Sequence, residues 1–150
     1  MNFIREAVIE DIHLLAEIFD QYRIFYEKKS DIDSAKIFLG DRIKLGESKI
    51  FISMDDDVIS GFVQLYPIFS STQMKRLWLL NDLFVDPKFR GQGISKKLIE
   101  ECKGHSVRTN ASGLILETAK SNTIGNQLYP SVDFNLDQDH NYYYWENNAI

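Results

Sequence analysis

The stretch that decides the fold runs from Leu83 to Leu98 and reads Leu-Phe-Val-Asp-Pro-Lys-Phe-Arg-Gly-Gln-Gly-Ile-Ser-Lys-Lys-Leu. It starts at the end of Arg76–Val85, a segment that is apolar on both faces, as a covered central strand would be. Asp86-Pro87 breaks that strand, and apolar residues then recur at helical spacing, at Ile94, Leu98, Ile99 and Cys102. The stretch therefore predicts a buried strand, a glycine turn and a helix, in that order.

The turn Arg90-Gly91-Gln92-Gly93-Ile94-Ser95 has two glycines where the strand leads into the helix. Such a turn directs free backbone N–H groups and the positive end of the helix dipole at an anion, for which a pyrophosphate is suitable. A P-loop spacing is absent, and a dinucleotide fingerprint would need a third glycine at position 96, where the chain has Lys96. Neither of these two phosphate-binding designs fits well.

Outward from this turn, strand and helix patterns alternate along the chain. Strands are predicted at Ile4–Val8, Lys49–Met54, Val58–Tyr66, Arg76–Val85, Gly113–Thr118 and Asn141–Glu146. A helix is predicted where apolar residues recur from Ile12 to Tyr26, with Glu10 and Asp11 in its first turn. Further helices are predicted over Asp33–Leu45, Ile94–Cys102 and Asn122–Pro130. This order indicates one α/β domain over residues 1–150, with a mixed sheet between two layers of helices.

The turn resembles Arg/Gln-x-x-Gly-x-Gly/Ala, the pyrophosphate-binding signature of the GNAT N-acetyltransferase family, with Ser95 at the last position. Val85-Asp86-Pro87 and the opening Ile4-Arg5-Glu6-Ala7 are also similar to that family, so the resemblance covers most of the chain. It implies a three-layer GNAT fold, with a central mixed, twisted sheet of about seven strands and helices on both faces. It also implies that acetyl-CoA is bound by Arg90, Gly91, Gln92, Gly93, Ile94, Ser95 and Lys96, with Leu83, Phe84 and Val85 binding pantetheine through their backbone.

A second family element follows about 30 residues later, where Asn122, Leu128-Tyr129 and Phe134 resemble Asn…Leu-Tyr-x-x-x-Gly-Phe. The resemblance implies that Asn122 and Tyr129 face the pantetheine arm and that Tyr129 protonates the departing thiolate. Asp133 stands where the family has glycine, and Pro130 follows the tyrosine, so the loop after Tyr129 departs from the pattern.

Asn81-Asp82 is a polar pair inside an apolar strand. With the acidic and aromatic ending of the chain, it looks most like Hpa-type and spermidine/spermine-type members, many of which have Glu-Asp at this point. Because an asparagine cannot act as a base, Asp82 or a relayed water is expected to deprotonate the amine. As an alternative, an aspartate beside a bulge can merely satisfy backbone groups.

The resemblance implies acetyl transfer to a primary amine, which can be a polyamine, a small amine or a lysine of a basic protein, by direct attack in a ternary complex. The alternatives are a catalytically weak acyl-CoA-binding sensor and a GNAT enzyme that acts on a drug or a peptide N-terminus. A net charge of −5 argues against nucleic acid as a partner. With no long apolar run, one cysteine (Cys102) and no metal-ligand pattern, we expect a cytoplasmic protein without a metal or a membrane partner. The aromatic ending favours a homodimer.

Overall fold

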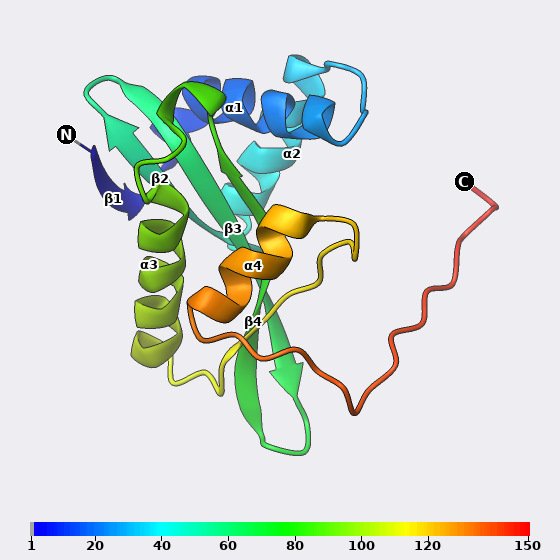
Figure 1. Cartoon of the computed structure of the whole chain (residues 1–150). Helices are drawn as coiled ribbons and strands as arrows, with labels where there is room; N and C mark the ends of the chain where they lie inside the picture. The colour runs from blue at the N-terminus through cyan, green and yellow to red at the C-terminus, as the bar shows by residue number, and fades with distance from the viewer. Residues whose placement is uncertain (1) are drawn as a thin grey trace. The chain divides into compact units, whose positions relative to one another are not determined.

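The computed structural model describes residues 2–150, which form two compact units: one ends at Glu117 and the other is Thr118–Ile150. The first unit contains the sheet and three longer helices (Figure 1). Its elements are β1 (Asn2–Glu6), η1 (Ile9–Asp11), α1 (Ile12–Phe25), α2 (Ile32–Lys44), β2 (Lys49–Asp55), β3 (Val58–Ser70), β4 (Lys75–Val85), η2 (Pro87–Phe89), α3 (Ile94–Arg108) and β5 (Leu114–Ile115). The single domain expected over residues 1–150 stays a prediction.

The described residues form one five-stranded sheet in the order β1-β2-β3-β4-β5. The first four strands are antiparallel neighbours, and β5 lies parallel to β4, so the sheet is mixed as predicted. The predicted number of about seven strands is too high for residues 2–150. The α/β class and the strand–turn–helix order around Gly91 are confirmed.

The sheet is covered on both faces, as side-chain alternation along β2 shows. Ile50 and Ile52 belong to the core cluster with Leu15 and Leu39 of α1 and α2. Phe51, which points to the opposite face, lies with its ring 5.5 Å from that of His105 in α3. Helices α1 and α2 therefore cover one face, and α3 covers the other.

Strand β3 does not end at Pro67, where the sequence predicted its end, but continues to Ser70. Pro67 pairs with Trp78 of β4, whereas the pairing of β3 with β2 stops at Leu65. A proline lacks an N–H group and is tolerated where one side of a strand has no neighbour. The open side of β3 beyond Leu65 meets that condition.

Two predicted strands are wrong in the structure. The segment Gly113–Thr118 is reduced to the two-residue β5, and Asn141–Glu146 is not a strand. A strand needs a neighbour to satisfy its N–H and C=O groups, and the described residues provide none for the tail. Its aromatic residues, Tyr142–Trp145, are 76 to 85% exposed. The homodimer expected from this tail stays a prediction.

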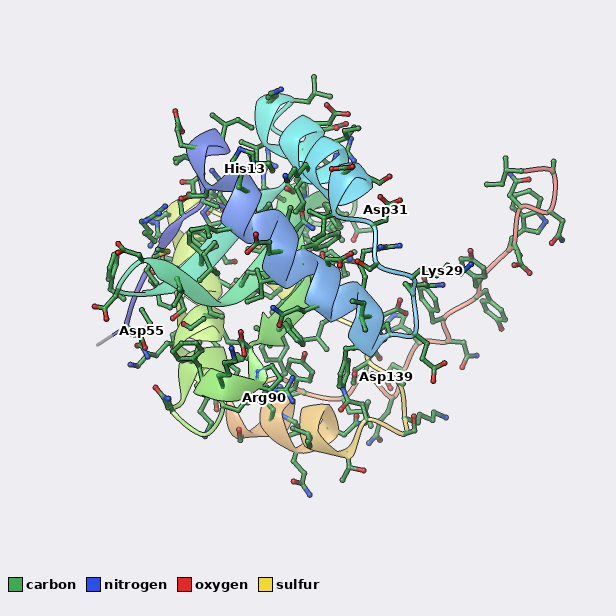
Figure 2. All side chains as sticks on the ribbon, turned by 90° about the horizontal axis from the view of Figure 1, so that it is seen from above. His13, Lys29, Asp31, Asp55, Arg90 and Asp139 are labelled. Atoms are coloured by element: carbon green, nitrogen blue, oxygen red, sulfur yellow. The ribbon has the colours of Figure 1, made fainter. Side chains whose placement is uncertain are left out.

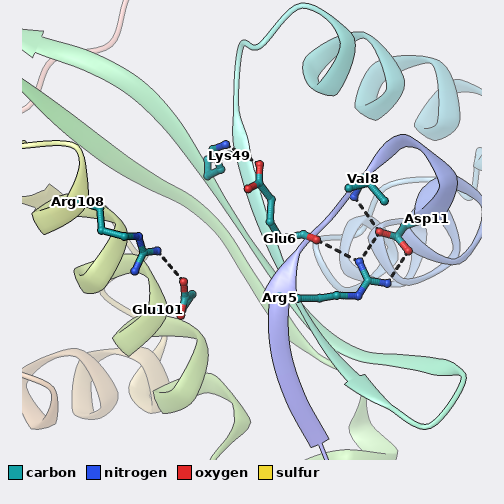
Figure 3. A network of polar contacts seen from close by, with 7 residues as sticks. All are labelled: Arg5, Glu6, Val8, Asp11, Lys49, Glu101 and Arg108. Atoms are coloured by element: carbon teal, nitrogen blue, oxygen red, sulfur yellow. Dashed lines mark hydrogen bonds and ion pairs between the residues drawn. The ribbon is translucent and has the colours of Figure 1, made fainter.

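A polar network fixes the start of the chain (Figure 3). Both terminal guanidinium nitrogens of Arg5 in β1 donate to Asp11 at 2.8 Å, and the N–H of Val8 donates to the same carboxylate at 2.8 Å. Lys49 of β2 donates to Glu6 of β1 at 2.5 Å. These contacts connect β1 to its neighbouring strand and to the first turn before α1.

Asp11→Asn is expected to lower the free energy of unfolding at pH 7 by about 1 kcal/mol, because a charge-assisted pair with Arg5 is lost. The hydrogen bonds from Arg5 hold the pKa of Asp11 below its usual range. The contribution is therefore complete above the unfolded-state pKa of about 3.9 and disappears as the pH falls through the lower folded-state pKa. Urea unfolding across this range should show the difference, whereas Asp57→Asn, in an exposed turn, should show almost none. An equal effect of both variants would contradict this role for Asp11.

In the second unit, helix α4 (Thr123–Ser131) is followed by an irregular tail. Across residues 2–150, no helix has the length and apolar character that a membrane crossing requires.

Candidate functional site

The glycine turn has the backbone conformation that the sequence predicted. Gly91 and Gly93 have φ values of +80° and +76°, in the left-handed region that favours glycine. Gly93 is the residue before α3, and no side chain caps the helix there in the described structure. The first N–H groups of α3 therefore have neither an intrahelical acceptor nor a side-chain cap.

Open space next to both glycines distinguishes this turn from a packed one. A Cβ placed on Gly91 or Gly93 would meet no atom of the described residues within 4 Å. Gln92 and Lys96 beside them are exposed, whereas Ile94 is buried and anchors the turn in the core. Backbone N–H groups, a helix N-terminus and open space together fit the pyrophosphate of CoA.

Gly91→Ala is expected to raise the Kd for CoA about tenfold, because the new methyl group would occupy this open space and the residue would resist a positive φ. It should also cost about 1–2 kcal/mol of stability. Gly46→Ala is the matched control, since Gly46 has φ +64° with no atom within 4 Å and lies at the end of α2. Titration calorimetry and thermal unfolding measure both effects. If the two variants bind CoA equally well, the turn is not the CoA site.

Another glycine, Gly61 of β3, allows α3 to start close to the sheet. A Cβ on Gly61 would lie 3.1 Å from the carbonyl oxygen of Phe84 and 3.2 Å from a methyl carbon of Ile94. Strand β4 and the first residue of α3 both pack against this position. The start of the helix is therefore held directly against the end of β4.

Arg90 has a structural partner inside the turn. Its Nε donates to the carbonyl of Val85 at 3.0 Å, and its guanidinium carbon lies 5.4 Å from the ring centroid of Phe84 and 5.9 Å from that of Phe25. Figure 2 shows the labelled Arg90 near the C-terminal part of α1. Arg90 therefore stabilises the strand end in addition to any contact with phosphate.

Beyond Leu79, strand β4 has no β5 partner among the described residues, because β5 pairs only with Trp78 and Leu79. Backbone groups of Leu83, Phe84 and Val85 that point to this side are not used by a sheet ladder. A register shift interrupts the pairing with β3, where Gln64 faces Asp82 and Leu65 faces Leu80. Asn81 is the extra residue, so the predicted polar pair lies at a β-bulge.

Asp82 is 5% exposed and accepts several hydrogen bonds. Gln64 Nε2 donates to Oδ2 at 2.7 Å, Asn81 Nδ2 donates to Oδ1 at 3.0 Å, and the phenol of Tyr22 in α1 is a third donor. Burial raises the pKa of Asp82 above its ordinary value, although these donors oppose the shift. A buried carboxylate with a raised pKa that is held by neutral donors is a stronger proton acceptor than an exposed aspartate, as a general base requires.

Sequence reasoning missed three members of this cluster: Tyr22, Gln64 and Tyr66. Burial and the charge of Asp82 raise the pKa of Tyr66 to about 12, so its phenol stays protonated at neutral pH. Gln64 could have been found, because it is the one amide in the apolar segment Val58–Tyr66. Its pairing with Asp82 depends on strand register, which the pattern did not reveal.

Asn122 and Tyr129 belong to the second unit. Asn122 Oδ1 accepts from the N–H of Gly125 at 3.1 Å and its Nδ2 donates to Thr118 at 2.9 Å, so it is the N-cap of α4. Tyr129 is half-buried, with its ring 5.8 Å from that of Phe134. Asp133 has φ +70°, which explains why the family prefers glycine there. The predicted contacts of Asn122 and Tyr129 with pantetheine stay predictions.

No group of three or more His, Cys, Asp or Glu side chains suited to a metal ion occurs within residues 2–150. Cys102 is buried, and burial raises the pKa of its thiol to about 12, which favours a packing role.

Comparison with known proteins agrees with this geometry. The model of the acetyltransferase (GNAT) family matches residues 13–134. An uncharacterized N-acetyltransferase of Bacillus subtilis, YhfO, is 39% identical over 134 residues, which are 89% of this chain and 90% of that protein.

Solved structures show the same fold. The crystal structure of a probable acetyltransferase superposes with a TM-score of 0.92 at 34% identity and covers 97% of each chain. At 18% identity, a predicted acetyltransferase with acetyl-CoA from Clostridium acetobutylicum has a TM-score of 0.77 over 96% of each chain, which shows the fold alone. From the family match and these relatives, the chain belongs to the GNAT acetyltransferase family and is an acyltransferase.

Proposed function

We propose that this protein transfers an acetyl group from acetyl-CoA to a primary amine, by direct attack in a ternary complex. The acceptor is a polyamine, a small amine or a lysine side chain. The observation that carries the proposal is the buried carboxylate of Asp82, placed at the bulge of the strand that leads into the open glycine turn. The likeness to N-acetyltransferases over most of the chain supports it.

Acetyl-CoA, when bound, supplies an activated acetyl group as a thioester. The turn Arg90–Ser95 and Lys96 are proposed to hold its pyrophosphate, and the free edge of Leu83–Val85 its pantetheine arm. The free edge and the glycine turn follow each other along the chain at the end of β4. Acetyl-CoA whose pyrophosphate is held at the turn would therefore extend its pantetheine arm toward the free edge.

Asp82 prepares the acceptor. A primary amine with a pKa near about 10.4 is mostly protonated at neutral pH, so it must lose a proton before its lone pair can attack. Asp82 takes that proton, directly or through a water. The amine nitrogen then forms a bond to the acetyl carbon and loses a second proton, which balances the one that the thiolate takes up. The carbon–sulfur bond breaks, and the thiolate leaves with the electron pair.

Tyr129 is the proposed donor of the proton that the thiolate takes up, because a phenol is a suitable acid for this step. A backbone N–H of the opened β4 is the proposed donor to the developing oxyanion. The products are an N-acetylated amine and free CoA, and one net proton is released from the ammonium.

A thiol-release assay with acetyl-CoA tests the proposal against polyamines, lysine peptides, aminoglycosides and peptides with a free N-terminus. Turnover of polyamines or lysine side chains supports it. If only drugs or peptide N-termini react, the acceptor class is wrong. If nothing reacts while calorimetry still detects CoA binding, the chain is an acyl-CoA sensor.

A further inference from the structure

Gln64 has a buried acceptor atom that the protein does not use. The residue is 0% exposed in the middle of β3, and its Nε2 donates to Asp82 at 2.7 Å. Its other amide atom, Oε1, is buried and has no hydrogen-bond partner within residues 2–150. An unpaired buried acceptor costs stability, which a ligand with a matching donor can recover.

The direction of the Gln64 amide follows from its neighbour. The NH₂ end faces the ionised carboxylate of Asp82, because Oε1 in that place would bring two acceptors together. Oε1 is therefore the end of the amide that does not bond to Asp82. Asn81, which also donates to Asp82, is exposed, so the cluster adjoins the surface.

The groups around Asp82 are neutral donors. Tyr22 of α1 donates to Asp82, as Gln64 and Asn81 do. Burial raises the pKa of Tyr66 of β3, whereas the charge of Arg42 of α2 and a hydrogen bond with the side chain of Gln64 lower it. The phenol of Tyr66 remains protonated because its pKa is about 12. Asp82 is thus the carboxyl group of this cluster, and a cationic donor is the natural complement of its ionised form.

We propose that Gln64 is a substrate-positioning residue: Oε1 accepts an N–H of the acceptor amine while Nε2 holds the carboxylate of Asp82. A primary ammonium has three N–H groups. After one proton passes to Asp82, two N–H groups remain, and a bond from one of them to Oε1 directs the lone pair. Gln64 therefore selects acceptors with N–H donors over cations without them. This inference rests on the proposed function, through Asp82.

Binding to the unaltered protein tests the inference first. In the presence of CoA, n-butylamine should shift the side-chain amide resonance of Gln64 in a nitrogen-15 NMR titration. Butyltrimethylammonium, a cation without N–H groups, should leave this resonance in place. The absence of a shift with n-butylamine, or an equal shift with both cations, would overturn the proposal.

Kinetics provide the second test. Gln64→Met, which keeps a similar volume, should raise the KM for a primary amine about tenfold and leave the Kd for CoA unchanged. It should also move the acid limb of the pH profile to higher pH, because the bond from Gln64 lowers the pKa of Asp82. Gln73→Met, at an exposed position of the β3–β4 turn, is the control and should change neither quantity. An unchanged KM in Gln64→Met contradicts the proposal.

Tyr66→Phe separates the amine from an internal partner. Because the side chain of Gln64 is hydrogen-bonded to the Tyr66 phenol, this variant should shift the Gln64 resonance without any amine, and n-butylamine should then shift it further. If n-butylamine no longer shifts it in Tyr66→Phe, the amine acts through Tyr66 and the inference is wrong. Failure of the proposed function looks different: Asp82→Asn would then keep its acid limb, while the n-butylamine shift at Gln64 would persist.

Discussion

Asp82→Asn is expected to lower kcat/KM for the acceptor amine by about 10²–10⁴-fold, the usual contribution of a general base. Asparagine keeps the size of the side chain and one of its two acceptor oxygens, so the fold should survive. It cannot take a proton. The Kd for CoA, which binds through the glycine turn, should stay within twofold of the wild-type value.

The pH dependence makes this test specific. Because burial raises the pKa of Asp82, activity of the wild-type enzyme should fall as the pH drops through that raised value and the carboxylate becomes protonated. Asp82→Asn should lose this acid limb. Asp20→Asn is the matched control: Asp20 is also buried, 4% exposed, but it binds Ser30 and the N–H of Asp31 at the α1–α2 loop. Asp20→Asn should keep the acid limb of the pH–activity profile even if the variant is less stable. If Asp82→Asn also keeps this limb, another group is the general base.

Tyr129→Phe is expected to lower kcat about 10²-fold with little change in CoA affinity. Phenylalanine retains the edge contact with Phe134, and the backbone bond from the N–H of Phe134 to the Tyr129 carbonyl, 3.0 Å long, is unaffected. The variant therefore removes the hydroxyl without disturbing the local packing. Single-turnover rates with acetyl-CoA and saturating amine measure the chemical step.

Tyr142→Phe provides the control for this experiment, since it removes a phenol from the exposed tail, where the side chain is 76% accessible. Its turnover should match that of the wild type. If Tyr129→Phe also turns over at the wild-type rate, Tyr129 is not the general acid, and water or another donor protonates the thiolate.

Local patterns were sufficient for much of the fold. The helix at Ile94 is predicted to start at the residue where the structure begins it, because apolar periodicity and chain-breaking residues act over a few positions. The first helix is predicted with Glu10 and Asp11 in its first turn, whereas these residues form η1 and α1 begins at Ile12. The end of β3 was missed, since whether a strand tolerates Pro67 depends on the length of the neighbouring strand. The missing strand at Asn141–Glu146 has the same kind of cause: aromatic residues favour a strand, but pairing needs a partner.

The sequence by itself determined the family and the glycine turn, because positive φ values and a strand–helix junction are encoded by Gly91, Gly93 and their immediate neighbours. It also indicated Asp82, as a charge within an apolar strand. Only the tertiary structure decided what surrounds that carboxylate. Gln64 and Tyr22 reach it from 18 and 60 residues away, across a register shift and a helix packed on the sheet. Such contacts depend on strand register and helix packing, which no local pattern specifies.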